Sequence, residues 1–316
     1  MPSLVTFGET SAVFVARDIG RMRYCRDFGL RPGGAEATVA VGVQRLGFTS
    51  GWISALGDDE LGHYLRGLVA GEGVDVSQVA TVAGRQTAVF LRERLPGGNA
   101  RHFYYRQDSA FSAYTPEMLD ESYIAGAKVA HLTGINPALS ANCDAASWRL
   151  IEIAKSHGVL TTFDPNVRLS LWSREEARRS LERYFAAADI VFPGLEDMQM
   201  LYGRMDTDGA LNRLHQLGCM RFVLKAGEGE VIVCDRGERS VLPVEKVEFP
   251  VDLMGAGDAF AAGCIAGLLR GLDLADAARI GVAVASLAIQ MPGNIEAMPT
   301  WKEVQRAVER KEVWRR

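Results

Sequence analysis

The chain has 316 residues, of which 48% are apolar and 23% charged, which is ordinary for a globular protein with a sizeable core. Its net charge of −4 gives no electrostatic case for a nucleic-acid or membrane partner. No apolar run reaches the ~18 residues of a membrane helix, and the N-terminus lacks the features of a signal peptide. Five cysteines without a Cys-x-x-Cys pair are typical of free thiols, so we expect a cytoplasmic protein.

Short β-branched runs alternate with helical segments along most of the chain. The expected strands lie at residues 4–7, 49–55, 129–132, 159–163, 190–192 and 222–225. The expected helices lie at residues 37–46, 61–72, 143–157, 174–187, 207–217, 257–269 and 274–290. This βαβα order predicts an α/β fold with a mainly parallel sheet between two helical layers.

Two segments break this order and predict a small separate sheet. Residues 12–30 lack helical periodicity, and strands at 87–94 and 101–106 are joined by a Pro-Gly-Gly-Asn loop, a good hairpin signal. We expect one domain over residues 1–316, with a β lid inserted at about 11–33 and 85–108. The exposed strand edges of such a lid would be protected by pairing between two subunits, which predicts a homodimer through the lid.

The most informative motif is Gly255-Ala256-Gly257-Asp258, followed by a small, apolar helical run. Glycines allow close backbone approach to a ligand, and the N–H groups of a helix N-terminus bind anions. Asp258 in the first turn suits a base that accepts a proton from an attacking hydroxyl while the amides hold a transferred phosphoryl group. An ordinary helix cap is the structural alternative.

Other candidate ligand groups follow predicted strands or lie on the lid. In an open parallel sheet, ligands bind beyond the carboxyl ends of the strands. Arg168 follows one strand there and can grip a carboxylate or phosphate, and Lys225 leads into a glycine-rich turn. Tyr104 and Arg106 share one face of a lid strand, which suits an acidic, hydroxylated small molecule. Turns and ordinary packing of the lid explain these patterns as well.

The chain resembles the ribokinase-like (PfkB-type) carbohydrate kinases over nearly its whole length. The family's two signatures are recognisable at residues 33–47, beginning Gly33-Gly34-Ala35-Glu36, and at residues 255–260. Within the family it is most similar to 2-keto-3-deoxygluconate kinases. The strings that carry this likeness are Gly8-Glu9, Tyr104-Tyr105-Arg106, His131-Leu132-Thr133-Gly134-Ile135 and Phe163-Asp164-Pro165-Asn166-Val167-Arg168.

The resemblance implies a ribokinase-like three-layer αβα core, ATP and Mg²⁺ as cofactors, and a role for each matching residue. Asp258 is then the general base, with Gly255, Ala256 and Gly257 as the anion hole. The implied sugar-acid contacts are Gly34, Phe90, Tyr104, Tyr105, Arg106, Arg168 and Asn294. The implied nucleotide contacts are Asn166, Arg168, Lys225, Gly227, Glu228, Gly229, Gly255 and Gly257. Asp197 is the candidate metal ligand.

Four positions depart from the family pattern. Leu253 and Met254 replace two threonines before the glycine turn, which removes hydroxyls near the phosphate and leaves a need for a monovalent cation open. Thr38 replaces an asparagine of the first signature, and Gly194 replaces the asparagine of a motif tied to Mg²⁺. None of these changes removes the expected base or anion hole.

The sequence therefore predicts ATP-dependent phosphorylation of a keto-deoxy sugar acid, 2-keto-3-deoxygluconate, on a primary hydroxyl. A fructokinase or another sugar kinase of the same fold is the nearest alternative, and a nucleoside kinase fits less well. A sugar- or nucleotide-binding regulator without catalysis is the alternative from another class. A dinucleotide-dependent oxidoreductase is disfavoured, because no Gly-x-Gly-x-x-Gly follows the first strand.

Overall fold

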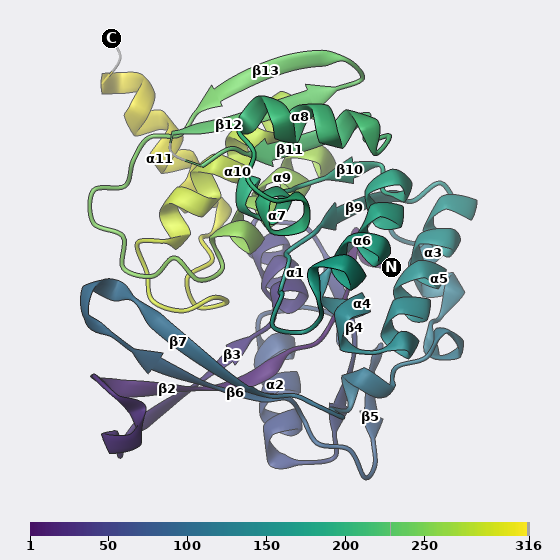
Figure 1. Cartoon of the computed structure of the whole chain (residues 1–316), viewed down its shortest axis with the longest axis vertical. Helices are drawn as coiled ribbons and strands as arrows, with labels where there is room; N and C mark the ends of the chain where they lie inside the picture. Colours follow the sequence, from purple (N-terminus) through teal and green to yellow (C-terminus); the bar gives the residue numbers. More distant parts are fainter. Residues whose placement is uncertain (228, 315–316) are drawn as a thin grey trace.

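A mainly parallel sheet forms the frame of the computed structural model, which describes residues 1–227 and 229–314 (Figure 1). Within these residues its strands lie in the order β13 (Glu238–Pro243), β12 (Glu230–Asp235), β11 (Arg221–Lys225), β10 (Ile190–Val191), β9 (Leu160–Asp164), β8 (Val129–Thr133), β1 (Leu4–Phe7), β4 (Ser50–Gly57) and β5 (Val79–Val82). Only the β11–β12 and β12–β13 pairs are antiparallel. The carboxyl ends of the parallel strands therefore meet at one edge, where ligands bind in such sheets.

Helices cover both faces of this sheet, as the sequence predicted. On one face lie α1 (Ala35–Arg45), α2 (Glu60–Gly71), α9 (Ala256–Leu269) and α10 (Leu274–Ala288). On the other lie α5 (Ala141–Ser156), α6 (Arg174–Ala187), α7 (Leu195–Tyr202) and α8 (Thr207–Gln216). The remaining helices are α3 (Glu121–Ala125), α4 (Ile135–Leu139) and α11 (Trp301–Trp314), which packs on α10.

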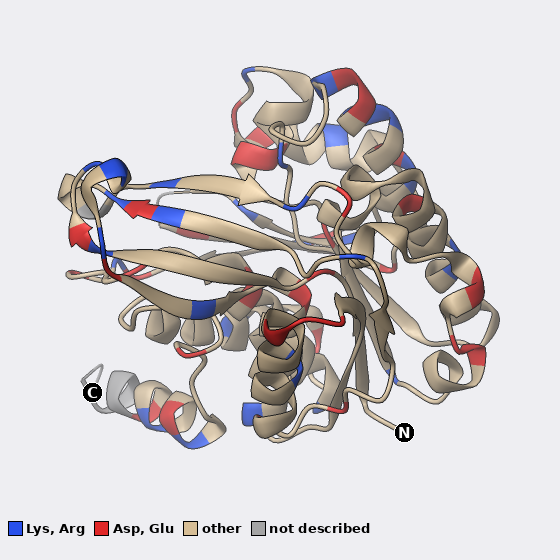
Figure 2. Ribbon diagram, turned by 90° about the horizontal axis from the view of Figure 1, so that it is seen from below, with Lys and Arg blue, Asp and Glu red and all other residues tan. Residues whose placement is uncertain are grey.

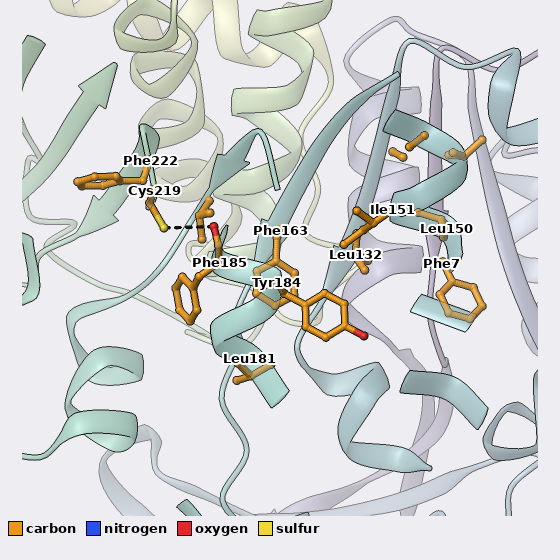
Figure 3. Packing of buried hydrophobic residues seen from close by; sticks show 14 of the residues in the cluster. Phe7, Leu132, Leu150, Ile151, Phe163, Leu181, Tyr184, Phe185, Cys219 and Phe222 are labelled. Atoms are coloured by element: carbon orange, nitrogen blue, oxygen red, sulfur yellow. Dashed lines mark hydrogen bonds between the residues drawn. The ribbon is translucent and has the colours of Figure 1, made fainter. Parts of the chain in front are cut away.

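Aromatic side chains fill the core between the sheet and α6 (Figure 3). Phe163 of β9 stacks on Tyr184 of α6 with ring centroids 5.3 Å apart. Phe185 contacts the Phe163 ring edge-on. The Cys219 thiol donates to the Phe185 carbonyl at 3.3 Å. Such close packing fixes β9, whose last residue, Asp164, reaches the ligand-binding edge.

A second sheet stands off the main body as a lid (Figures 1 and 2). Its strands are ordered β3 (Phe28–Gly33), β2 (Ser11–Ile19), β6 (Val89–Arg94) and β7 (Ala100–Tyr105). The register aligns Arg31, Val13, Phe90 and Tyr104 on one face, and Leu30, Phe14, Leu91 and Phe103 on the other. The expected hairpin is confirmed, because β6 and β7 pair antiparallel around the Pro-Gly-Gly-Asn loop.

Most predicted elements are confirmed to within about two residues, and the expected lid strands are present. The sequence analysis missed the helices α3, α4, α7 and α11 and the edge strands β5 and β13. Of these, α7 begins directly after Gly194 and spans only two turns. All five cysteines are free thiols, as expected. Across the described part of the chain, no helix has both the length and the apolar character that a membrane span requires.

Candidate active site

A cavity of ≈ 950 Å³ opens at the carboxyl ends of β9, β10 and β11, against the N-terminus of α9. It collects most of the residues that the sequence analysis assigned to catalysis and nucleotide binding. These are Asn166, Arg168, Asp197, Lys225, Gly227, Gly255, Ala256, Gly257 and Asp258. Four segments between Asn166 and Asp258 thus meet at one cavity, as expected for the carboxyl edge of an open parallel sheet.

The N-terminus of α9 has the geometry that an anion site needs. Gly255 caps the helix with a φ of 83°, a left-handed conformation that favours glycine. A Cβ on Gly257 would lie 3.6 Å from the Lys225 Nζ, so the cation approaches the helix end closely. The Ala256 N–H donates to the Leu253 carbonyl at 3.3 Å. The other N–H groups of this turn, the helix dipole and Lys225 together favour a bound phosphate.

Three carboxylates surround Lys225 at this edge. Its Nζ donates to the Asp164 Oδ2 at 2.8 Å. Burial opposes the charged form of Lys225, but Asp164 and Asp197 outweigh that effect and raise its pKa, so the lysine stays a cation. Burial, and then the Asp164 charge, raise the pKa of Asp258 to about 6. A carboxylate with that pKa is a suitable general base near neutral pH.

Asp197 has a structural task as well as a place in the cavity. Its carboxylate accepts from the Gly194 N–H and the Val167 N–H, each at 2.9 Å, so it caps α7 and holds the chain after β9. Burial and Asp164 raise the pKa of Asp197. No group of three or more metal-ligating side chains occurs among the described residues. Three carboxylates nevertheless surround the single lysine here, and this excess of negative charge fits Mg²⁺. The ion binds one or two carboxylates and takes its other ligands from phosphates and water.

The expected sugar contacts lie beside this cavity, under the lid. A Cβ on Gly34 would lie 2.4 Å from the Thr10 Oγ1, so only glycine fits at this crowded point. Phe90 and Tyr104 lie with ring centroids 5.1 Å apart on the lid face that turns toward the main body. Asn294 borders Gly255, whose Cβ position is 3.3 Å from the asparagine Cγ.

Four buried polar atoms of the expected sugar contacts and their neighbours have no hydrogen-bond partner inside the described parts of the protein. They are the Thr10 Oγ1, the Thr38 Oγ1, the Arg106 Nε and the Asn294 Oδ1. Unsatisfied buried polar atoms are uncommon in native proteins and call for a partner. A polyhydroxylated ligand would supply such partners.

Arg106 differs from the expectation of a cation available to the substrate. Its guanidinium forms an ion pair with Glu9, whose side chain is only 2% exposed and also accepts from Ser109. Arg168, by contrast, is exposed at the cavity and its charge lowers the pKa of Asp258 against the dominant effect of burial. Of the two expected cations, Arg168 is the one that forms no ion pair among the described residues, so its guanidinium is available to a ligand.

Two expected contacts are not brought to the site, and a third cannot be placed. Tyr105 pairs with Val89 on the opposite lid face and is 65% exposed, because neighbouring residues of a strand alternate between faces. Gly229 lies on the glycine turn but outside the cavity wall. Glu228 lies outside the described residues.

Sequence reasoning overlooked Glu36 and His102. Glu36 is 1% exposed and accepts from the Thr133 Oγ1 at 2.6 Å, and burial raises its pKa to about 7. His102 contacts Phe90 on the inner face of the lid. Only the position of Glu36, two residues after Gly34 in the first signature, gave a signal; His102 gave none.

Comparisons with known proteins agree with this geometry. Residues 1–301 match the pfkB family of carbohydrate kinases. The 2-dehydro-3-deoxygluconokinases of Bacillus subtilis strain 168 and Thermoproteus tenax are each 34% identical; the alignments cover 94% and 96% of this chain and 92% and 94% of theirs. Fructokinase-1 of Oryza sativa subsp. japonica is 32% identical over 97% of both chains.

Solved structures show the same fold. A PfkB protein from Polaromonas sp. JS666 superposes with a TM-score of 0.88 at 31% identity, over 96% of this chain and 99% of that one. A sugar kinase from Pyrococcus horikoshii in complex with ATP has a TM-score of 0.83 at 27% identity, over 96% of this chain and 99% of that one. The family match, the identities and the ribokinase-like fold agree, and the chain belongs to the pfkB family of carbohydrate kinases.

Proposed function

We propose that this carbohydrate kinase transfers the γ-phosphoryl group of ATP to the primary hydroxyl of 2-keto-3-deoxygluconate, forming the 6-phosphate. The observation that carries the proposal is the position of Asp258. Its carboxylate lies in the first turn of α9, beside the anion-binding N–H groups, in a cavity large enough for a nucleotide. The 34% identity to two 2-dehydro-3-deoxygluconokinases supports the choice of substrate.

In the proposed reaction, Asp258 accepts the proton of the sugar hydroxyl while the hydroxyl oxygen forms its bond to the γ-phosphorus. The bond between that phosphorus and the β–γ bridging oxygen breaks, and ADP leaves with the electron pair. The N–H groups of Gly255, Ala256 and Gly257 hold the charge of the transferred group.

The nucleotide would lie along Asn166, Lys225 and Gly227, which line the cavity. A Mg²⁺ ion accompanying ATP would be held by Asp197 with Asp164 close by, and when bound it neutralises phosphate charge.

Phosphorylation of fructose is the second candidate, and one observation favours it. Glu9 neutralises Arg106, so the sugar pocket offers less positive charge than two free arginines would. The 32% identity to a fructokinase agrees with this alternative. Arg168 therefore decides between the two, because only an acidic sugar gains from a free guanidinium at the cavity.

The test is ADP release with Mg-ATP against 2-keto-3-deoxygluconate, 2-keto-3-deoxygalactonate, fructose and ribose. The proposal expects turnover on a keto-deoxy acid and little on the neutral sugars. Turnover on fructose alone would replace the substrate and retain the kinase. No turnover on any sugar would contradict the proposed activity.

The proposal extends to assembly and location. Residues 1–316 form one ribokinase-like domain in this account, with lid segments 11–33 and 85–108. Leu30 and Phe103 are more than a third exposed in the apolar row on the lid's opposite face. Two copies that pair through this face would cover the row and the lid edges, which supports a homodimer. The five free thiols suit a cytoplasmic location.

A further inference from the structure

An ion pair joins the lid to the loop that precedes the anion hole. Arg92 of β6 donates from Nη1 to the Asp252 Oδ2 at 2.7 Å and from Nη2 to the Asp252 Oδ1 at 2.8 Å. The two side chains are 14% and 8% exposed. The pair is a two-pronged guanidinium–carboxylate contact, the geometry that makes such bonds strong and directional.

Both ends of this pair belong to functional parts of the site. Arg92 lies two residues after Phe90, on the same inner lid face, and opposite His102. Asp252 lies three residues before Gly255, and its Oδ1 accepts the Met254 N–H at 3.1 Å. Among the ion pairs of the described residues, this is the one that joins the lid to the segment just before Gly255, and it is largely buried.

Asp252 also holds a second loop. Its Oδ2 accepts weakly from the Gly293 N–H at 3.4 Å, next to the expected sugar contact Asn294. Burial alone would raise the pKa of Asp252, but Arg92 and the backbone N–H groups outweigh it and hold the pKa below its usual range. Removing the guanidinium would leave a buried carboxylate without a counter-charge, and the loop would have to rearrange.

We propose that the Arg92–Asp252 pair is a positioning link through which the lid, when it holds the sugar, fixes the anion hole for phosphoryl transfer. The inference rests on the kinase activity proposed above, but it holds for any sugar that binds under the lid. Neither side chain touches the reacting atoms. The pair acts through Met254 and Gly255, and it makes transfer to sugar faster without making ATP bind more tightly.

The test compares Arg92→Ala with Arg94→Ala. Arg94 lies on the same strand and the same face, and it donates to the Arg17 carbonyl instead of to Asp252. Arg92→Ala is expected to lower kcat about 10-fold to 100-fold, with the KM for ATP changed less than about threefold, as misplacement of a catalytic group does. Arg94→Ala is expected to keep kcat within about threefold.

Two further measurements separate a link from general damage. Millimolar guanidinium chloride, compared with NaCl at equal ionic strength, should restore part of the activity of Arg92→Ala. The double variant Arg92→Ala/Asp252→Ala should lose about as much as the worse single variant, because residues that act as a unit are not additive.

A readout without turnover keeps this inference distinct from the proposed function. Amide hydrogen exchange of residues 252–257 should rise in Arg92→Ala and stay at the wild-type level in Arg94→Ala. If no sugar is phosphorylated by the wild type, the proposed function fails, and the exchange result still decides on the link. Wild-type kcat and exchange in Arg92→Ala, or equal losses in both variants, would overturn the inference.

Discussion

Replacing Glu36 by Gln tests the electrostatics of the buried site in a way that needs no substrate. Glu36 lies in the first turn of α1, and a Cβ on Gly8 would clash with its carboxyl carbon at 2.1 Å. Burial raises its pKa from 4.5 to about 7, partly offset by the hydrogen bond from Thr133. A glutamine keeps an oxygen that accepts from Thr133 but has no charge to bury.

The sign and size of the effect follow from linkage. A carboxyl whose pKa is raised in the folded state keeps its proton longer than in the unfolded chain. The protonated carboxyl's full contribution to the free energy of unfolding is present below pH 4.5, and this contribution is lost as the pH rises to about 7. At 1.36 kcal/mol for each unit of pH, the wild type loses about 3 kcal/mol over that range, and Glu36→Gln does not.

The assay is reversible urea unfolding of both proteins at several pH values between 5 and 8. The free energy of unfolding of Glu36→Gln, minus that of the wild type, should rise with pH and level off above about pH 7.5. Glu60→Gln, at an exposed position in the first turn of α2, is the matched control and should give a flat difference. A difference for Glu36→Gln that does not change with pH would refute the reasoning.

Three other predictions concern the site and the lid. The pKa of about 6 at Asp258 predicts that kcat/KM rises about tenfold per pH unit below pH 6 and flattens above it, since the deprotonated base is the active form; a pH-rate profile that is flat from pH 5 to 8 would exclude this base. Arg168→Gln should raise the KM for a sugar acid at least about tenfold and leave fructose nearly unaffected, whereas Arg178→Gln, an exposed change on α6, should do neither; equal effects on both sugars would remove the argument for an acid. Phe103→Glu should convert a lid-paired dimer into a monomer in light scattering after gel filtration, and a wild type that is monomeric at micromolar concentration would contradict the dimer.

The sequence predicted well wherever the signal was local. The glycine turn before Asp258 was identified from adjacent residues, because glycines, a carboxylate and an apolar helical run lie within one short stretch. The β-branched runs of the central strands and the Pro-Gly-Gly-Asn hairpin are equally local signals. These features depend on backbone conformation and on burial, which short patterns determine.

The ion pairs that determine which charged side chains are available to ligands could not be predicted from the sequence, because they join distant positions. Arg92 and Asp252 are 160 residues apart, and Lys225 and Asp164 are 61 apart. The pairing of Arg106 with Glu9 changed the expected charge of the sugar pocket for the same reason. No pattern within one sequence selects such partners, since many carboxylates could pair with each arginine.

The measurement that tests the central claim most directly is sugar-phosphate formation from 2-keto-3-deoxygluconate and Mg-ATP by the wild type and by Asp258→Asn. Asp276→Asn, the same change in the first turn of the neighbouring helix α10, is the control. The account predicts that Asp258→Asn loses at least about 100-fold in kcat while the wild type and the control form the phosphate at equal rates. An Asp258→Asn variant as active as the wild type would contradict it.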